Sequence, residues 1–459
     1  MRNVALTSTV ILLLTLPCAV QAQFTFITNN GAITITGYTG SDDMVTIPTT
    51  INGLPVASVG EYAFQDRSDL VSIAIPNSVT NIGNEAFEGC SALTTVSLGS
   101  GVLNIGFLAF ANCFGLESIL IPNSVMNISD SAFLQCVNLM DVSLGDGVMS
   151  IGHQAFVYCT SLTSIVVPNS VTNIGEDSFG FCYNLTNITV AADNPAYSGL
   201  NGVLFDKNQT TLVECPGGYT GSYIVPNGVM NIGNGAFSEC FGLTSVAIPD
   251  GVLNIGFSAF YGCSSLTSIA IPDSVTNISG HAFETCAGLT NVSLGDGVIN
   301  IDYWAFLDCS SLTSIVIPSS VMSIGDRAFQ LCTSLTKVTF LANAPALSGG
   351  SWFFLDPAKV YYYYGTTGWG TTYGSRPTVM LGAPAPRIGD SGSLGVQSNQ
   401  FSFTVAGVTN QTVVIETCTD LTQIDWLPIA TNTLINGSSY FSDPQWTNYP
   451  SRFYRLRSQ

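Results

Sequence analysis

The stretch LTSIAIPDSVTNISGHAFETC, at residues 266–286, decides the fold because its pattern returns every 23 residues within two blocks of the chain. A buried-type phenylalanine marks each return. The positions are Phe64, Phe87, Phe110, Phe133, Phe156 and Phe179, then Phe237, Phe260, Phe283, Phe306 and Phe329. A fixed period of this length is typical of a solenoid, in which each unit packs only on its neighbours. We therefore predict an α/β solenoid, dominated by β structure, that is built from 23-residue units.

Each unit predicts two short strands and one helical turn. Apolar residues alternate near the end of the segment 93–98, which indicates a strand. A proline such as Pro272 ends the equivalent strand, where a missing amide donor is tolerated. The segment 79–82 indicates a second strand, and 84–90 is expected to form one helical turn with Ala86, Phe87 and Cys90 facing inward.

Composition and charge exclude two classes of partner. Only 9% of the 459 residues are charged, against about 25% in typical soluble domains. The formal net charge is −19, and Lys207 is the only cation between Arg67 and Arg327. Because nucleic acids and anionic lipids are bound by clustered lysine and arginine, we expect neither as a partner. The acidity itself favours solubility and self-repulsion.

Ten of the 13 cysteines occupy one repeat position, three residues after the phenylalanine. They are Cys90, Cys113, Cys136, Cys159, Cys182, Cys240, Cys263, Cys286, Cys309 and Cys332. This is the most apolar part of the unit, so we predict a buried ladder of free thiols. Disulfides between neighbouring units stay open as an alternative in an exported chain. Zinc needs four converging ligands, so we predict no metal site.

An asparagine also recurs, in the second predicted strand of most units, as at Asn81, Asn104 and Asn127. Stacked amides can hydrogen-bond along the axis and satisfy buried polar groups. We therefore interpret the asparagines as a structural ladder rather than as a row of binding residues.

The chain is expected to contain eight segments in order. Residues 1–22 are typical of a secretory signal peptide, with Arg2, an apolar run and a small-residue cleavage site. The others are an N-terminal cap at 23–60, a first repeat block at 61–190, an irregular hairpin insertion at 191–224, a second repeat block at 225–340, an aromatic C-terminal cap at 341–382, a linker at 383–400 and a β-sandwich-like module at 401–459. No later apolar run is long enough for a membrane-spanning helix.

The aromatic C-terminal cap carries the candidate ligand contacts, which are Trp352, Tyr361, Tyr363, Trp369 and Tyr373. They either form a lid on the last core layer or a platform for sugars or peptides. The outward residues of the repeat strands are small by comparison and are neither aromatic nor charged, as at Thr95, Ser97, Ser268 and Ala270. Tight interaction hot spots usually contain Trp, Tyr and Arg, so the strand face alone predicts weak contacts.

The sequence predicts no enzyme, no cofactor and no catalytic residue. Residues 389–392 resemble the nucleophile motif of trypsin-like proteases, but a serine nucleophile needs a positioned histidine base and an oxyanion hole. The only histidines are His153 and His281, which we expect to be exposed at variable positions of the repeats.

The recurring pattern, with Ala282, Phe283 and Cys286 in the quoted stretch, resembles the BspA-type leucine-rich repeats of bacterial surface proteins over about residues 40–380. The resemblance implies a secreted or surface-attached curved solenoid and association with adhesion to host proteins, other cells or matrix. The C-terminal module departs from the wall-anchoring tails often joined to such repeats. We expect a non-catalytic protein that binds an extracellular protein or polysaccharide. The alternative is a structural, self-associating envelope protein without a specific ligand.

Overall fold

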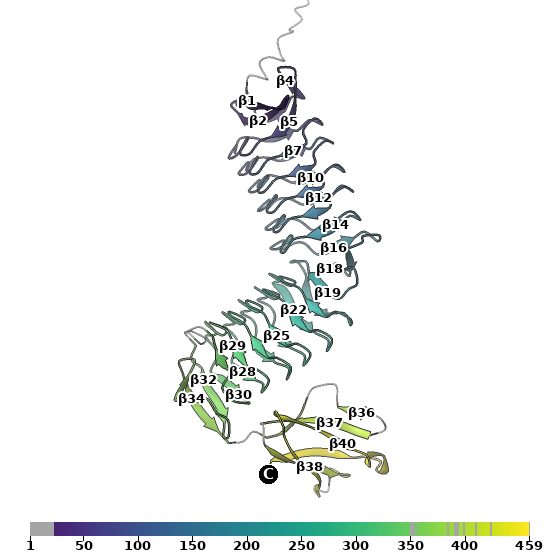
Figure 1. Ribbon diagram of the computed structural model, residues 1–459, viewed down its shortest axis with the longest axis vertical. Coiled ribbons are helices and arrows are strands. Elements are labelled where there is room, and N and C mark those ends of the chain that lie inside the picture. The colour runs from purple at the N-terminus through teal and green to yellow at the C-terminus, as the bar shows by residue number, and fades with distance from the viewer. Residues whose placement is uncertain are drawn as a thin grey trace, which may run out of the picture. The chain divides into compact units, whose positions relative to one another are not determined.

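The computed structural model describes residues 23–348, 353, 356–382, 385–389, 394–397, 400–408, 411–422 and 425–458. The chain divides into two compact units, the first ending at Ala196 and the second beginning at Tyr197. Figure 1 shows stacked short strands in both. Within the described residues the only helix is a 3-10 turn, η1 (Trp446–Asn448).

The first unit has a sheet of very short strands along one face, which we call the short-strand face. An antiparallel pair begins it and parallel pairing continues it, so that Asn104 lies between Asn81 and Asn127. In order the strands are β1 (Phe24–Asn29), β2 (Ala32–Tyr38), β5 (Leu54–Val59), β7 (Asn81–Ile82), β9 (Asn104–Ile105), β11 (Asn127–Ile128), β13 (Ser150–Ile151) and β15 (Asn173–Ile174), with β4 (Thr50–Ile51) beside β5.

A second face of the first unit carries the longer strands, and we call it the long-strand face. Alternation places Ile119 and Val142 inside and their neighbours outside. The parallel strands are β3 (Met44–Thr46), β6 (Ser72–Ala74), β8 (Thr95–Ser97), β10 (Ser118–Leu120), β12 (Asp141–Ser143), β14 (Ser164–Val167) and β16 (Asn187–Val190).

The second unit repeats this arrangement after an antiparallel start. Its short-strand face consists of β17 (Tyr197–Leu200), β18 (Val203–Asp206), β19 (Thr211–Glu214), β21 (Asn231–Ile232), β23 (Asn254–Ile255), β25 (Asn277–Ile278), β27 (Asn300–Ile301), β29 (Ser323–Ile324) and β31 (Ala346–Leu347). Its long-strand face consists of β20 (Thr220–Ile224), β22 (Gly242–Ala247), β24 (Ser268–Ala270), β26 (Asn291–Ser293), β28 (Ser314–Ile317), β30 (Lys337–Phe340), β32 (Lys359–Tyr363) and β34 (Arg376–Leu381), with β33 (Thr372–Tyr373) antiparallel to β34.

Two antiparallel sheets follow near the C-terminus. One contains β35 (Arg387–Ile388), β36 (Gly395–Gln397), β37 (Gln400–Ala406) and β40 (Ser438–Asp443), and the other contains β38 (Thr412–Cys418), β39 (Leu427–Thr433) and β41 (Phe453–Ser458). They share one apolar core, in which Phe403 and Phe441 from the first sheet meet Val413 and Ile415 from the second.

The third face of each turn is not the helical turn that was predicted. At 84–90 the amides of Glu85, Phe87 and Gly89 donate to the carbonyls of residues 107, 109 and 111 in the next turn, at 2.8, 2.8 and 2.9 Å. Glu85 and Gly89 have φ values of 53° and 74°. Because a helix needs negative φ throughout and uses its amides internally, this segment is a bridge between turns instead. We call this third face the turn face.

The predicted columns of core residues line up inside both units. Each phenylalanine of the period is buried, and neighbouring rings stack nearly in parallel, as with Phe110 and Phe133 at 5.4 Å and 4° or Phe306 and Phe329 at 5.3 Å and 0°. Centroid separations of this size are those of offset stacking. In the second unit the ring column continues to Phe353 at 5.6 Å.

The cysteines form the expected ladder of free thiols. All twelve cysteines of the described residues are free and buried. Each thiol in the regular part donates to the carbonyl of the phenylalanine of the preceding turn, as Cys136 Sγ does to Phe110 O at 3.2 Å. Burial raises the pKa of Cys90 to about 12 and that of Cys113 well above its ordinary value. The Sγ atom is thus a second donor to a carbonyl that already accepts from an amide of its own turn, as Phe110 O does from Cys113 N at 3.4 Å.

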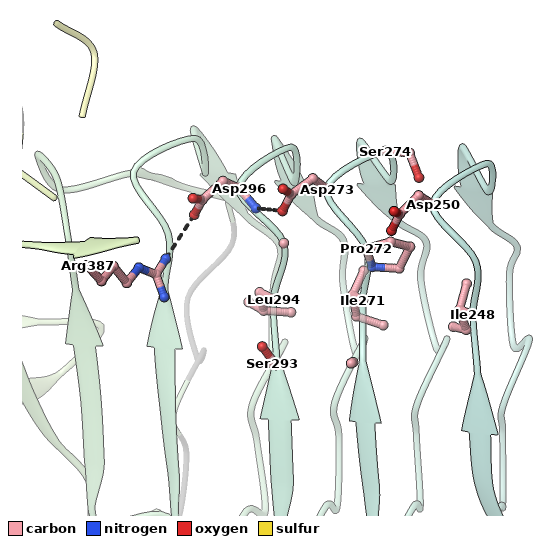
Figure 2. Close-up of a pocket in the computed structure, with 12 residues that line it drawn as sticks. Ile248, Asp250, Ile271, Pro272, Asp273, Ser274, Ser293, Leu294, Asp296 and Arg387 are labelled. Carbon is pink, nitrogen blue, oxygen red and sulfur yellow. Dashed lines mark hydrogen bonds and ion pairs between the residues drawn. The ribbon is translucent and has the colours of Figure 1, made fainter. Parts of the chain in front are cut away.

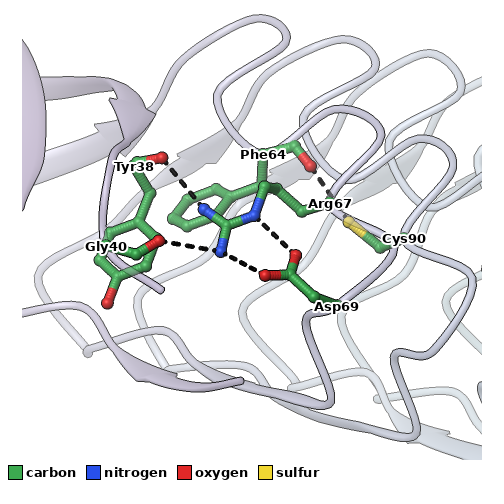
Figure 3. Close-up of polar contacts among 6 residues, drawn as sticks. All are labelled: Tyr38, Gly40, Phe64, Arg67, Asp69 and Cys90. Carbon is green, nitrogen blue, oxygen red and sulfur yellow. Dashed lines mark hydrogen bonds and ion pairs between the residues drawn. The ribbon is translucent and has the colours of Figure 1, made fainter. Parts of the chain in front are cut away.

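Arg67 stands where the ladder would continue toward the N-terminus (Figure 3). Its guanidinium donates to the carbonyls of Tyr38 and Gly40, both at 3.1 Å, and binds both carboxylate oxygens of Asp69 at 2.8 and 3.0 Å. Its Cζ also lies 5.2 Å from the ring centroid of Tyr38. One long side chain therefore satisfies the carbonyls at the end of the column.

Candidate binding surfaces

The aromatic cap separates into an inward part and an outward part. Trp369 stacks on Tyr362 at 5.0 Å and 13°, and its Nε1 donates to Thr366 Oγ1 at 2.9 Å. Tyr373 is buried, its hydroxyl donates to the carbonyl of Pro345 at 2.8 Å, and burial raises its pKa. These two candidate residues cover the last core layer. Trp352 lies outside the described residues.

Tyr361 and Tyr363 form the outward part of the cap. They alternate with Tyr362 along β32, so they lie on the opposite side of the strand from the ring that Trp369 covers. Lys337 Nζ lies 5.4 Å above the centroid of Tyr361, and burial raises the pKa of Tyr363. Both rings are half-buried, so only part of each could contact a ligand.

The asparagine ladder lies at the surface, not in the core. Asn127 Nδ2 donates to Asn104 Oδ1 at 2.9 Å, and Asn173 Nδ2 donates to Ser150 Oγ at 3.0 Å. These side chains line a groove of about 640 Å³ along the short-strand face of the first unit, together with residues of the turn face such as Phe107. A linear ligand in this groove would meet one amide or hydroxyl per turn.

A second pocket, of about 520 Å³, lies at the end of the long strands in the second unit (Figure 2). Asp250, Asp273 and Asp296 line it at equivalent positions of three turns. Asp273 Oδ1 accepts a hydrogen bond from the backbone amide of Asp296 at 2.8 Å, and Asp296 Oδ1 lies 3.1 Å from Arg387 Nη2. Two of the three carboxylates, those of Asp273 and Asp296, are thus engaged in the protein's own contacts. In the described part of the chain no three His, Cys, Asp or Glu side chains are grouped so as to hold a metal ion.

The histidines occupy different environments, and the prediction of exposure holds for His153 alone. The side chain of His281 is 16% exposed, contacts Glu284 and lies among aromatic rings. Of the protease-like motif only Gly389 belongs to the described residues. Sequence reasoning missed the ring cluster around His281, although comparing the residues at one position from unit to unit would have revealed it. No helix within the described ranges is long and apolar enough to cross a bilayer.

Comparison with known proteins agrees with this repeat architecture. Residues 57–194 and 230–353 match the BspA type leucine rich repeat region, in six copies. A leucine rich cell surface protein from Faecalibacterium prausnitzii is 32% identical, with a TM-score of 0.58, over 69% of this chain and 93% of that one. The pneumococcal vaccine antigen PcpA is 23% identical, with a TM-score of 0.57, over 74% of this chain and 85% of that one, which shows a shared fold. No curated protein sequence matches this chain significantly.

Proposed function

Because this chain belongs to the BspA type leucine-rich repeat family, we propose that it is an exported, non-catalytic protein that mediates adhesion by binding an extracellular protein or polysaccharide. The similar Faecalibacterium protein is described as a cell surface protein. Residues 1–22 of this chain have the composition of a secretory signal peptide. Both observations support a location outside the cytoplasm.

The single observation that carries the proposal is the repetition of surface positions from turn to turn. Asn81, Asn104 and Asn127 lie side by side on the short-strand face, and Ser118 lies beside Asp141 on the long-strand face. Stacked repeats of this kind present extended surfaces that suit large partners. The buried thiols support the non-catalytic part of the proposal, because a nucleophilic cysteine needs a lowered pKa and access to solvent.

Binding to a panel of extracellular ligands tests the proposal. The mature chain would be immobilised and exposed to matrix proteins, whole bacterial and epithelial cells, and neutral polysaccharides, with binding measured by surface plasmon resonance or cell counting. We expect saturable binding to at least one ligand. Replacing Tyr361 and Tyr363 with serine tests whether the cap or the repeats contact the ligand, because only a contact at the cap would lose affinity. Absence of binding to every member of the panel would reject an adhesive function.

A self-associating envelope protein is the second candidate, favoured by isolated apolar side chains on the long-strand face. Leu120 is 68% exposed and Ile224 is 76% exposed. Light scattering of the mature chain at rising concentration, with and without calcium, distinguishes the candidates. Growth of the scattering mass with concentration supports self-association, whereas a constant monomer mass counts against it.

A further inference from the structure

The turn face of the second unit carries a ring cluster centred on His281, whereas the contacting rings of Tyr158, Phe181 and Tyr183 in the first unit lie at other positions of the repeat. We call it the Trp304 patch, and it consists of Phe257, His281, Tyr303, Trp304 and Arg327 on four consecutive turns. At the position of Trp304 the first unit has Tyr62 in its first turn and the non-aromatic residues Glu85, Leu108, Ser131, Gln154 and Asp177 in the following turns. Since the backbone is the same at these positions, with φ between 51° and 59°, the fold itself does not require aromatic residues there.

His281 is the centre of the patch. Its ring meets those of Phe257, Tyr303 and Trp304 edge-on, with centroid distances of 4.8, 5.3 and 4.7 Å and interplanar angles of 63°, 87° and 83°. Its Nδ1 atom contacts Glu284 Oε2. Edge-to-face contacts of this kind fix the rings relative to one another. The patch is therefore a preorganised surface rather than a set of independent side chains.

A glycine makes room for the most exposed ring. A Cβ atom on Gly280 would lie 2.9 Å from Tyr303 Cζ, and Gly280 does not adopt the left-handed φ at which glycine is otherwise favoured. Other units have Asn84, Asp130 or Asn234 at the position of Gly280. The missing side chain thus allows the Tyr303 ring to lie across the backbone of the preceding turn.

Much of this aromatic surface remains in water. Phe257 is 41% exposed, Tyr303 is 49% exposed, and the side chain of Arg327 is 46% exposed. Arg327 Cζ lies 5.8 Å from the Trp304 ring centroid, and its Nε atom lies 3.5 Å from Asp326 Oδ2. Tyr, Trp and Arg are the residues enriched at the centres of protein interfaces. A rigid, half-exposed group of them marks a surface for a macromolecular partner.

The charges around the patch indicate the chemistry of that partner. Arg327 is the only lysine or arginine between Lys207 and Lys337, whereas Glu284, Asp302 and Asp326 lie on the turns that carry the rings. Asp302 Oδ2 already accepts a hydrogen bond from Asn277 Nδ2 at 3.1 Å, which holds this carboxylate in place. Because complementary charge steers association, an acidic surface with exposed rings fits a basic partner.

We propose that the Trp304 patch docks an arginine-rich or lysine-rich segment of a protein partner, an inference that rests on the adhesive function proposed above. Basic side chains of the partner lie on the exposed ring of Tyr303 and are attracted by the carboxylates of Asp302 and Asp326, which keep their contacts with Asn277 and Arg327. A cation placed over an aromatic ring is attracted by the negative face of the ring, more strongly when water is excluded. Two or three such contacts per partner segment give a specific interaction.

The test uses a fluorescein-labelled deca-arginine peptide and the full mature chain, with binding followed by fluorescence anisotropy. The patch variant Tyr303→Asn/Trp304→Ser copies residues that other units carry at the same positions, Asn84 and Ser131. The matched control Phe107→Asn/Leu108→Ser makes the same change on the first unit. We expect the patch variant to bind at least about fivefold more weakly. The control should bind like the unchanged chain.

A second variant keeps the rings of Tyr303 and Trp304 but changes how they are arranged. Gly280→Ala places a methyl group against Tyr303, so the ring must shift and affinity for deca-arginine should fall. Circular dichroism and thermal unfolding check that each variant is folded. Equal affinity in the patch and control variants, or no peptide binding by the unchanged chain, would overturn the proposal. Binding of cellohexaose that depends on Trp304, without deca-arginine binding, would identify a neutral glycan instead.

The adhesion panel separates failure of this inference from failure of the proposed function. If the patch variant adheres to cells and matrix proteins as the unchanged chain does, the Trp304 patch is not the contact and adhesion stands. If the unchanged chain adheres to no ligand, the adhesive function fails whatever the peptide result.

Discussion

At the scale of single residues, one phenylalanine per turn determines how well the layers pack. Phe133 is fully buried and lies between Phe110 and Phe156 at 5.4 and 5.1 Å. We predict that Phe133→Ala lowers the free energy of unfolding by about 3–5 kcal/mol, because a cavity replaces contacts on both sides. Urea denaturation followed by circular dichroism measures the loss.

The matched control for that change is Phe107→Ala on the same unit. Phe107 is 43% exposed and lies on the turn face, so its removal should change the free energy of unfolding by less than about 0.5 kcal/mol. Similar losses in the two variants would contradict the packing argument.

A second residue-scale prediction concerns Asp356, which takes the cysteine position in the last layer. Both carboxylate oxygens are buried and have no hydrogen-bond partner among the described residues, and burial raises the pKa to about 8. An unfolded aspartate has its pKa near 3.8, so between these pH values the folded chain binds more protons than the unfolded chain. Stability should therefore fall as pH rises from about 4 to 8, by up to about 1.4 kcal/mol per pH unit.

The variant Asp356→Asn isolates this contribution. Its amide has no charge to bury, so its stability should exceed that of the unchanged chain at pH 8 and should depend less on pH. Glu239, whose pKa burial raises to about 7, contributes with the same sign in both proteins and cancels in the difference. If the thermal-unfolding midpoints of the two proteins change equally between pH 4 and 8, Asp356 is not the source of the pH dependence.

At the scale of elements, the thiol ladder predicts low chemical reactivity. The ladder thiols are buried and donate to carbonyls, and burial raises the pKa of several of them, such as Cys113 and Cys263. Since the thiolate is the reactive form, Ellman's reagent at pH 8 should modify few cysteines in the folded chain and all twelve after unfolding in guanidinium chloride. Rapid modification of the folded chain would mean that the ladder opens readily.

The strands could be predicted from sequence, but the turn face could not. Alternating apolar residues are a local signal, so the strand containing Val96 is visible within a few residues of sequence. The bridge at 84–90 depends on carbonyls of the next turn and on left-handed φ at Glu85, which no local helical pattern reveals.

The candidate site shows the same division. The burial of Tyr373 and the exposure of Tyr303 follow from which neighbours reach each ring, as Pro345 reaches the hydroxyl of Tyr373. Clustering of aromatic residues in the chain indicated the cap region, but it did not separate rings that close the core from rings that face water. The residues of the Trp304 patch lie on four turns between positions 257 and 327, so a search for aromatic residues close together in the sequence does not find them.

At the scale of the whole molecule, the dominant electrostatic property is a net charge of −19. Repulsion among carboxylates destabilises a compact chain, and salt screens it as the Debye length falls from about 30 Å at 0.01 M to about 3 Å at 1 M. We predict that raising sodium chloride from 10 mM to 500 mM increases the midpoint of thermal unfolding. Differential scanning calorimetry at constant pH measures this, and a decrease would contradict it.

The 23-residue period was sufficient to predict the repeating parts of the chain, but not the segments that interrupt it. Repetition of core positions such as Phe110 and Phe133 was sufficient to predict stacking. The antiparallel start of the second unit, from Tyr197 to Glu214, depends instead on two tight turns. The first contains Asn201 and Gly202, with φ values of 52° and 82°, and in the second Asp206 Oδ1 accepts from the amides of Thr210 and Thr211 at 2.7 and 2.9 Å.

Arg67 has one further consequence, for polymerisation. A column of identical layers offers each new layer the same donors and acceptors, so an open end would recruit another copy and grow into a fibril. By occupying the carbonyls of Tyr38 and Gly40, the guanidinium removes two acceptors that a further layer of the thiol column could use. At this end of the column, one charged side chain thereby makes the addition of a further copy less favourable.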